Sequence, residues 1–133
     1  MNIVLLDERQ TQNEIWMIRS TRQLEHLIQH VKVAVGDSLK VGVRGGKRYL
    51  TEILSISEQG IAVKAIREEE IPAKLPVTLI VALPRPKVLR RLIMDAVTMG
   101  VDKIILIHSY RVDKSYWQTP FLSKLNEYVT LGL

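Results

Sequence analysis

The chain contains no cysteine and only one phenylalanine among its 133 residues. The absence of cysteine excludes disulfides, thiolate metal sites and cysteine nucleophiles, and it suits a reducing cytosol. No apolar run approaches the roughly 18 residues that a membrane-spanning helix requires. The first residues, MNIVLLDE, lack a basic segment and soon turn acidic, which argues against a secretory signal. These absences predict a cytoplasmic protein.

Glycine is missing where a nucleotide site would need it. The turn after the apolar run Val77–Leu83 reads Pro84-Arg85-Pro86-Lys87, whereas dinucleotide and P-loop sites place glycines there to let backbone N–H groups reach phosphates. A nucleotide enzyme of either type is therefore disfavoured. His26 and His30 stand four apart on a predicted helix, but they have no third ligand nearby, so no metal site is predicted. No Ser-His-Asp arrangement or carboxylate pair stands out, and the catalytic residues stay unknown.

The excess positive charge lies entirely in the second half of the chain. Residues 1–70 contain ten Lys and Arg and ten Asp and Glu, whereas residues 71–133 contain nine and four. The difference, nine minus four, equals the net charge of the whole chain, +5. A basic half and an isoelectric point near 9.6 predict a polyanionic partner such as nucleic acid, with simple solubility as the alternative.

The first half reads as a helix followed by short strands. Ser20–Val31 carries an apolar stripe at helical spacing, and Ser20 and Gln23 match a capping box. After this helix the apolar residues alternate, and Gly45-Gly46 is typical of a hairpin turn. The expected strands are Leu39–Val43, Tyr49–Ile56 and Ile61–Ile66, with Ile3–Leu6 and Ile15–Ile18 as further candidates. Short strands joined by such turns predict a small β-barrel.

The second half opens with a strand–helix–strand pattern. Val77–Leu83 and Lys103–His108 are unbroken apolar runs, and Lys87–Met99 between them has helical spacing that ends at Gly100. This order is typical of parallel strands joined by one helix, in a sheet that is covered on both faces. Such a unit cannot bury its own faces, and the 57 residues from Val77 onward are fewer than the roughly 100–150 of a typical domain.

Two further features complete the expected organisation. The stretch Arg67–Pro76 is polar, carries two prolines and is predicted to link two domains. A last helix is predicted with Thr119 as its N-cap and Pro120 as its first residue. The predicted fold class is therefore mixed, a small β-barrel followed by the first βαβ part of an α/β domain.

Basic side chains gather at three places that are predicted to contact RNA. They are Arg85, Lys87, Arg90 and Arg91 at the start of the second-half helix, Arg44, Lys47 and Arg48 at the hairpin turn, and Arg111 after the second apolar strand. Cations at a helix N-terminus oppose the helix dipole, which favours a phosphate contact over a stabilising role. Ser109 and Tyr110 stand with Arg111 just past the strand end, where open α/β sheets place ligand sites. The alternatives are exposed, solvated charge for the first two groups and an ion pair with Asp113 for Arg111. Tyr116 and Trp117 are interpreted as core or interface residues rather than base-stacking platforms.

Two long runs resemble one known family. HLIQHVKVAVGDSLKVGVRGGKRYLTEILSI is similar to the first domain of the ribosomal RNA small-subunit methyltransferase E family, and ALPRPKVLRRLIMDAVTMGVDKIILIHSYRV is similar to the opening of its second domain. The matching positions are His26-Leu27, His30-Val31-Lys32, Gly36-Asp37, Gly45-Gly46, Ala82-Leu83-Pro84, Ala96, Gly100-Val101 and Arg111. Lys32 replaces an arginine of the pattern and is a further candidate for RNA binding. Asp95 and Thr98 stand where the pattern favours Lys and Glu, which indicates a divergent branch.

The resemblance implies a PUA-like RNA-binding barrel over residues 1–72 and the N-terminal part of a knotted SPOUT domain over residues 73–133. It further implies transfer of a methyl group from S-adenosylmethionine to N3 of a uridine in 16S ribosomal RNA, by a homodimer. In the family the cofactor lies among glycine-rich loops of a C-terminal knot, so no cofactor-binding residue is expected in this chain.

Three functions follow as hypotheses. The first is the RNA-binding part of such a methyltransferase, inactive without the remainder of the enzyme. The second is a non-catalytic RNA-binding module, which a stop codon after Leu133 and a cooperative melt would favour. The third is a structural or dimerisation protein, which would form a stable oligomer indifferent to RNA.

Overall fold

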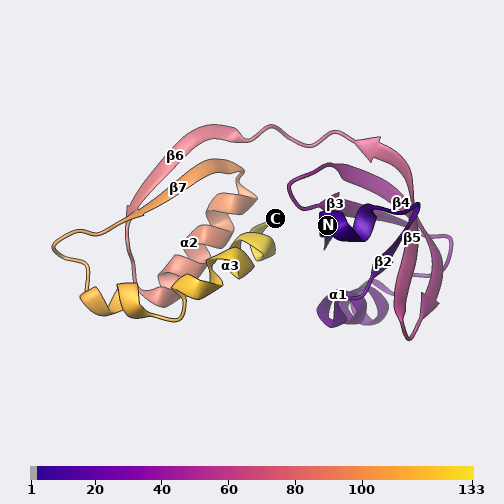
Figure 1. The fold of residues 1–133 in the computed structure, drawn as a ribbon, viewed down its shortest axis with the longest axis horizontal. Coiled ribbons are helices and arrows are strands. Elements are labelled where there is room, and N and C mark those ends of the chain that lie inside the picture. Colours follow the sequence, from indigo (N-terminus) through magenta and orange to yellow (C-terminus); the bar gives the residue numbers. More distant parts are fainter. Residues whose placement is uncertain (1–2) are drawn as a thin grey trace. The chain divides into compact units, whose positions relative to one another are not determined.

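The computed structural model describes residues 3–133, and these form two compact units, residues 3–71 and 72–133. Figure 1 shows a first unit dominated by strands and a second unit of two strands and packed helices. Each unit has its own hydrophobic core.

The first unit is built on a five-stranded sheet with the order β1-β3-β4-β5-β2. Its strands are β1 (Ile3–Leu6), β2 (Ile15–Ile18), β3 (Ser38–Val43), β4 (Arg48–Ser57) and β5 (Gly60–Glu69). β1 runs parallel to β3, and the other neighbouring strands are antiparallel. The alternating pattern of the sequence is reflected here, because Leu39 and Val41 of β3 are buried while Ser38 is exposed.

The predicted barrel is not closed by hydrogen bonds. Within residues 3–133, β1 and β2 form the two edges of the sheet and do not pair with each other. Both edge strands span only four residues, so each pairs with one neighbour over a short length. The mixed fold class is confirmed, and the closed barrel is not observed.

One helical segment covers the core of the first unit. α1 (Thr21–Glu25) continues directly into the π-helical turn η2 (His26–Val31), which confirms the predicted helix. Leu27 of η2 is 1% exposed and joins a core that includes Trp16 and Ile53. The predicted capping box is wrong: Ser20 makes no side-chain cap, and Gln23 Nε2 donates to the Leu5 carbonyl at 2.9 Å instead.

The predicted linker is shorter than the sequence indicates. β5 extends to Glu69 because Arg48, Tyr49 and Leu50 of β4 pair with residues 67–69. The connection between β5 and β6 is therefore confined to residues 70–74.

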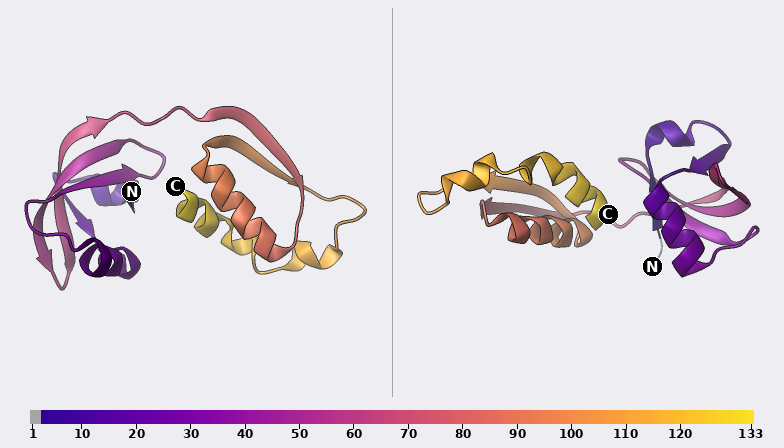
Figure 2. Two further views of the ribbon diagram at one scale, coloured as in Figure 1. Left: turned by 180° about the vertical axis from the view of Figure 1, so that it is seen from behind. Right: turned by 90° about the horizontal axis from the view of Figure 1, so that it is seen from below.

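The second unit contains the predicted crossover. β6 (Leu75–Ala82) and β7 (Val101–Ile107) are parallel and are joined by α2 (Pro86–Thr98). Gly100 follows α2 with a φ of +77°, a conformation that glycine adopts without strain. Leu89 and Ile93 of α2 pack with Leu83 in the core. α2 lies against α3 (Leu125–Gly132), as Figures 1 and 2 show.

The last helix begins later than predicted. η3 (Lys114–Gln118) and η4 (Leu122–Lys124) are short 3-10 segments that precede α3. Thr119 accepts two bonds in a turn, from Leu122 N to its carbonyl at 3.2 Å and from Phe121 N to its Oγ1 at 3.4 Å. It follows η3 as its C-cap, whereas Phe121 and Lys124 are the N-cap residues of η4 and α3. The predicted N-cap and first helical residue are therefore wrong, because Pro120 and Phe121 lie in turns before the first regular helical residue.

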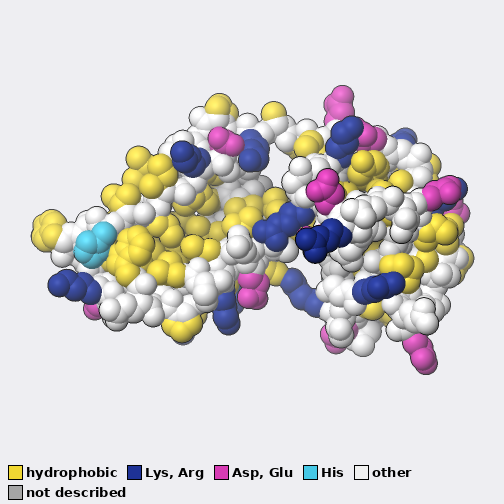
Figure 3. Space-filling view, in the orientation of Figure 1, with side chains coloured by type: hydrophobic (Ala, Val, Ile, Leu, Met, Phe, Trp, Pro, Cys, Tyr) yellow, Lys and Arg dark blue, Asp and Glu magenta, His cyan; other side chains and the backbone are white. Residues whose placement is uncertain are grey.

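One face of the two-stranded sheet is left open. Ile104 and Leu106 of β7 face the helices, whereas Ile80 of β6 is 61% exposed and Ile107 is 41% exposed. Figure 3 shows hydrophobic side chains at the surface of this unit. The sequence pattern predicts a sheet covered on both faces, and residues 3–133 cover only one of them.

Candidate nucleic-acid interface

The carboxyl ends of β6 and β7 meet at one edge of the second unit. Ala82 and Ile107 are register partners, and Leu83 N donates to the Ile107 carbonyl at 3.0 Å. The chain after β6 leads to Arg85, and the chain after β7 leads to Arg111. Open α/β sheets bind their ligands at this edge. The topology thus places two predicted site residues that are far apart in the sequence at the same edge of the sheet.

The first turn of α2 is cationic. Arg85 is the N-cap residue, Pro86 begins the helix, and no acidic residue occupies the first turn. Pro86 suits this position because its fixed φ matches the helix and its missing N–H needs no partner. Lys87 is exposed, as is Arg85. Both oppose the helix dipole, so these two cations do not serve to stabilise the helix.

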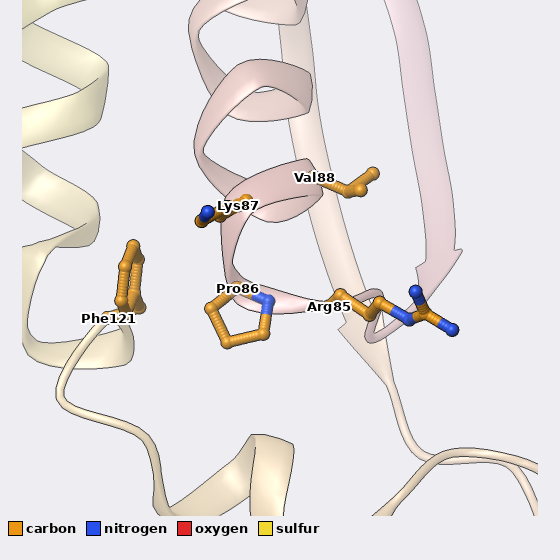
Figure 4. A pocket seen from close by; sticks show the side chains of 5 residues that line it. All are labelled: Arg85, Pro86, Lys87, Val88 and Phe121. Atoms are coloured by element: carbon orange, nitrogen blue, oxygen red, sulfur yellow. The ribbon is translucent and has the colours of Figure 1, made fainter.

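An open pocket of about 480 Å³ lies beside this turn. Figure 4 shows Phe121 across from Pro86 and Lys87, with the Arg85 guanidinium on the far side of the turn. Pro86, Val88 and Phe121 provide apolar surface, and the two cations provide the only charge on the pocket lining. This combination favours a ligand that carries both a flat apolar part and negative charge.

Arg90 and Arg91 follow on the same helix and are exposed. The Arg90 guanidinium carbon lies 5.9 Å from the centre of the Tyr128 ring, which packs in the core. Arg91 Nε lies 3.9 Å from Asp95 Oδ2 at the surface, a distance and exposure at which an ion pair contributes little. Among residues 3–133, no ion pair is formed by Arg85, Lys87 or Arg90, so this end of α2 keeps most of its positive charge.

Two cations of the hairpin, unlike those in the first turn of α2, are ion-paired with carboxylates. Lys47 Nζ donates to Glu68 at 2.8 Å, and this hydrogen bond raises the pKa of Lys47. Arg48 Nε lies 3.1 Å from Glu69 Oε2, and its Nη2 donates to the Glu70 carbonyl at 2.8 Å. The run Glu68–Glu70, interpreted from the sequence as solvated linker, therefore partners the hairpin. Of the three predicted hairpin contacts, Arg44 is exposed without an ion pair in the described part of the chain.

Lys32 lies where the helix of the first unit ends. Its φ and ψ of 59° and 48° are left-handed, and it is the only non-glycine residue with a positive φ among residues 3–133. Left-handed backbone costs a residue with a Cβ roughly 1–2 kcal/mol. The side chain is exposed, so nothing in its packing offsets this cost.

Replacing Lys32 by glycine is therefore expected to raise the free energy of unfolding by about 0.5–1 kcal/mol, because relief of strain exceeds the entropy that glycine loses on folding. Urea unfolding of the whole chain measures this. The matched control is Glu52→Gly at an exposed position inside β4, which is expected to lower stability by a similar amount. An equal loss for both variants would contradict the strain at Lys32.

The loop after β7 does not contain the alternative ion pair. Asp113 accepts from Ser115 N at 2.9 Å and from Ser115 Oγ at 2.7 Å, and these bonds lower the pKa of Asp113. Arg111 Nε instead donates to the Tyr110 hydroxyl at 2.8 Å. Tyr116 packs against the core of this unit, as predicted. Trp117 is 38% exposed and donates from Nε1 to His108 Nδ1 at 2.9 Å, so it is not a buried core residue, and its alternative as an interface residue stays a prediction.

Tyr110, which the sequence places beside Arg111 just past the strand end, is 89% exposed. Two other classes of site find no support in residues 3–133. No group of three His, Asp or Glu side chains is placed to hold a metal ion, and no helix there is long and apolar enough to cross a membrane.

Comparison with known proteins finds matches to the second unit and to the whole chain. Residues 71–130 match the model of a family described as an RNA methyltransferase domain. The ribosomal RNA small subunit methyltransferase E of Treponema pallidum (strain Nichols) is 28% identical over 100% of this chain, which covers 52% of that protein.

Solved structures share the fold. A ribosomal RNA small subunit methyltransferase E from Neisseria gonorrhoeae, bound to S-adenosyl methionine, matches with a TM-score of 0.74 at 16% identity over 99% of this chain and 55% of its own. A predicted RNA methyltransferase from Thermotoga maritima matches with a TM-score of 0.67 at 21% identity, over 98% of this chain and 58% of its own. The chain thus spans about half the length of these relatives. The second unit thus matches an RNA methyltransferase domain, and the whole chain is similar to about half of a ribosomal RNA small subunit methyltransferase E.

Proposed function

We propose that this chain supplies RNA binding to an S-adenosylmethionine-dependent methyltransferase that modifies N3 of a uridine in 16S ribosomal RNA. The observation that carries the proposal is the cationic first turn of α2, which keeps its charge at the carboxyl edge of the β6–β7 sheet. That turn lies inside the segment that matches the RNA methyltransferase domain family. Phosphates are the ligands that such a cluster of exposed Arg and Lys favours.

The candidate contacts fall into two groups that differ in their expected contribution to phosphate binding. Those with no ion pair or only a weak one are expected to contribute most to phosphate binding, and they are Arg85, Lys87, Arg90, Arg91, Arg111, Arg44 and Lys32. Lys47 and Arg48 are already ion-paired with carboxylates, so a phosphate would have to displace Glu68 or Glu69 from them. We therefore expect these two to contribute less.

The family supports a division of labour between the units. We propose that the first unit is a PUA-like RNA-binding domain and that the second is the N-terminal part of a knotted SPOUT domain, acting as a homodimer in the cytoplasm. The pocket at α2 does not suit the methyl donor: S-adenosylmethionine carries a positive sulfonium, and the charged side chains on the pocket lining, Arg85 and Lys87, are both cations. We accordingly place the cofactor outside residues 3–133, and the chain alone is expected to transfer no methyl group.

One observation favours a second candidate function. The open face of β6 and β7 exposes Ile80 and Ile107, and exposed apolar faces of this kind mark association surfaces. A structural or dimerisation protein would use this face and would form a stable oligomer whose assembly is independent of RNA.

The test is a titration of the 133-residue chain with a fragment of 16S ribosomal RNA over a range of salt concentrations. The proposal predicts a Kd of about 100 μM or tighter at physiological salt, weakening steeply as salt rises. If the chain forms oligomers but shows no salt-dependent RNA binding at about 100 μM, the proposed RNA-binding function is contradicted and the dimerisation function is supported.

A further inference from the structure

Tyr110 is the most exposed large hydrophobic residue of the second unit. The residue is 89% exposed on the loop that follows β7. Arg111 Nε donates to the Tyr110 hydroxyl at 2.8 Å, and the guanidinium carbon lies 5.4 Å from the ring centre. Because the hydrogen bond is made at the hydroxyl end, Arg111 restrains the ring while leaving most of its surface to solvent.

The loop that carries Tyr110 is ordered by its own hydrogen bonds. Val112 N donates to the Ser109 carbonyl at 3.0 Å, and Asp113 caps η3 through Ser115. At the far end, Trp117 donates to His108 at 2.9 Å, with ring centres 6.1 Å apart. A ligand of this loop would therefore meet aromatic groups that are already positioned, which lowers the entropy cost of binding.

The charge around these aromatic rings is positive. Arg111 and Lys114 lie on the loop, and Arg85 stands at the same carboxyl edge of the sheet. The acidic residue of the loop, Asp113, is occupied by two hydrogen bonds from Ser115. Exposed aromatic rings beside Arg and Lys are the combination that binds unpaired nucleotides, with bases on the rings and phosphates on the cations.

We propose that Tyr110 is a stacking platform for an unpaired base of RNA, with Arg111 as the residue that positions the ring and Arg85 and Lys114 as contacts for the flanking phosphates. This inference rests on the proposed RNA binding and specifies its form: single-stranded rather than helical RNA. A protein partner would also suit an exposed tyrosine and arginine, but the local excess of positive charge favours the nucleic acid.

The test compares Tyr110→Ala with Tyr110→Phe in the full chain. Three fluorescent probes of equal length are titrated: an unstructured single-stranded RNA, its duplex, and an abasic ribose-phosphate chain. Tyr110→Ala is expected to weaken binding of the single strand by about 5- to 100-fold, the loss typical of one stacked base. Its binding of the duplex and the abasic chain should not change. Tyr110→Phe keeps the ring and should stay within about threefold of the original chain.

The outcomes separate this inference from the proposed function. If all probes bind in a salt-dependent manner and Tyr110→Ala keeps the original affinity for the single strand, the proposed stacking role of Tyr110 is wrong. The proposed RNA binding of the chain is then still supported. If the original chain binds none of the probes, the proposed function fails, and the platform with it. If Tyr110→Ala changes only the oligomeric state in sedimentation, Tyr110 belongs to a protein contact, which also overturns the platform. Far-UV circular dichroism confirms that each variant is folded.

Discussion

Replacing Leu89 by alanine is expected to lower the free energy of unfolding of the second unit by about 2–5 kcal/mol. Leu89 is 0% exposed and holds α2 in a core with Leu83, Ile93 and Tyr128. Its removal takes apolar surface out of contact and leaves a cavity that the surrounding helices can fill only in part. Because a unit of about 60 residues is only marginally stable, this loss is comparable with its whole stability.

Native-state hydrogen exchange with mass spectrometry measures the effect separately for each unit. Peptides from residues 72–133 should lose protection in Leu89→Ala, while those from the first unit keep it. Ile80→Ala is the matched control, since Ile80 lies on the open face of the sheet and is 61% exposed. It should change stability by less than about 1 kcal/mol. A loss as large as that of Leu89→Ala would mean that something covers this face in solution.

Reversing the charge of Arg90 and Arg91 is expected to weaken binding of the ribosomal RNA fragment by about 10- to 100-fold at low salt. Each phosphate contact that is lost removes about 0.7–0.9 from the slope of log affinity against log salt, so the double variant Arg90→Glu, Arg91→Glu should have a slope about 1.4–1.8 smaller. Both side chains are exposed on α2. The variant should therefore fold, which circular dichroism verifies.

The control must change the net charge by the same amount elsewhere. Arg9→Glu with Arg22→Glu meets this need, because both residues are exposed in the first unit and neither is a candidate contact. This variant should keep the slope and most of the affinity. Equal losses for the two variants would show that RNA responds to net charge alone, and unchanged binding in both would remove α2 from the interface.

The helices and strands with a clear periodicity of apolar residues could be predicted from sequence. The pairing of side chains could not. The crossover β6–α2–β7 follows from two apolar runs and one amphipathic helix, because burial enforces those periods directly. The capping box failed because the Leu5 carbonyl, eighteen residues away from Gln23, offers an acceptor that no local pattern contains. Likewise the acidic run at Glu68 was read as linker because Lys47 is its partner only across a strand pair.

The candidate site shows the same division. The cationic start of α2 is visible in the sequence, since helix position and charge are both local properties. Whether each cation is ion-paired is not visible, because this depends on which carboxylates the fold brings near. Lys47 is paired with Glu68, and Lys87 has no such partner among the described residues. The exposure of Tyr110 is also a tertiary property, because a tyrosine three residues after a strand can turn inward or outward.

The sequence by itself determined the class of fold, the location of the basic half and, through its motifs, the resemblance to a family. These depend on period, composition and order, which are properties of the chain. Only the tertiary structure decided that β1 and β2 remain edges, that one face of β6–β7 stays open and that Arg85 and Arg111 share an edge of the sheet. Each of these depends on contacts between residues distant in the chain, whose free energies arise only when folding brings them together.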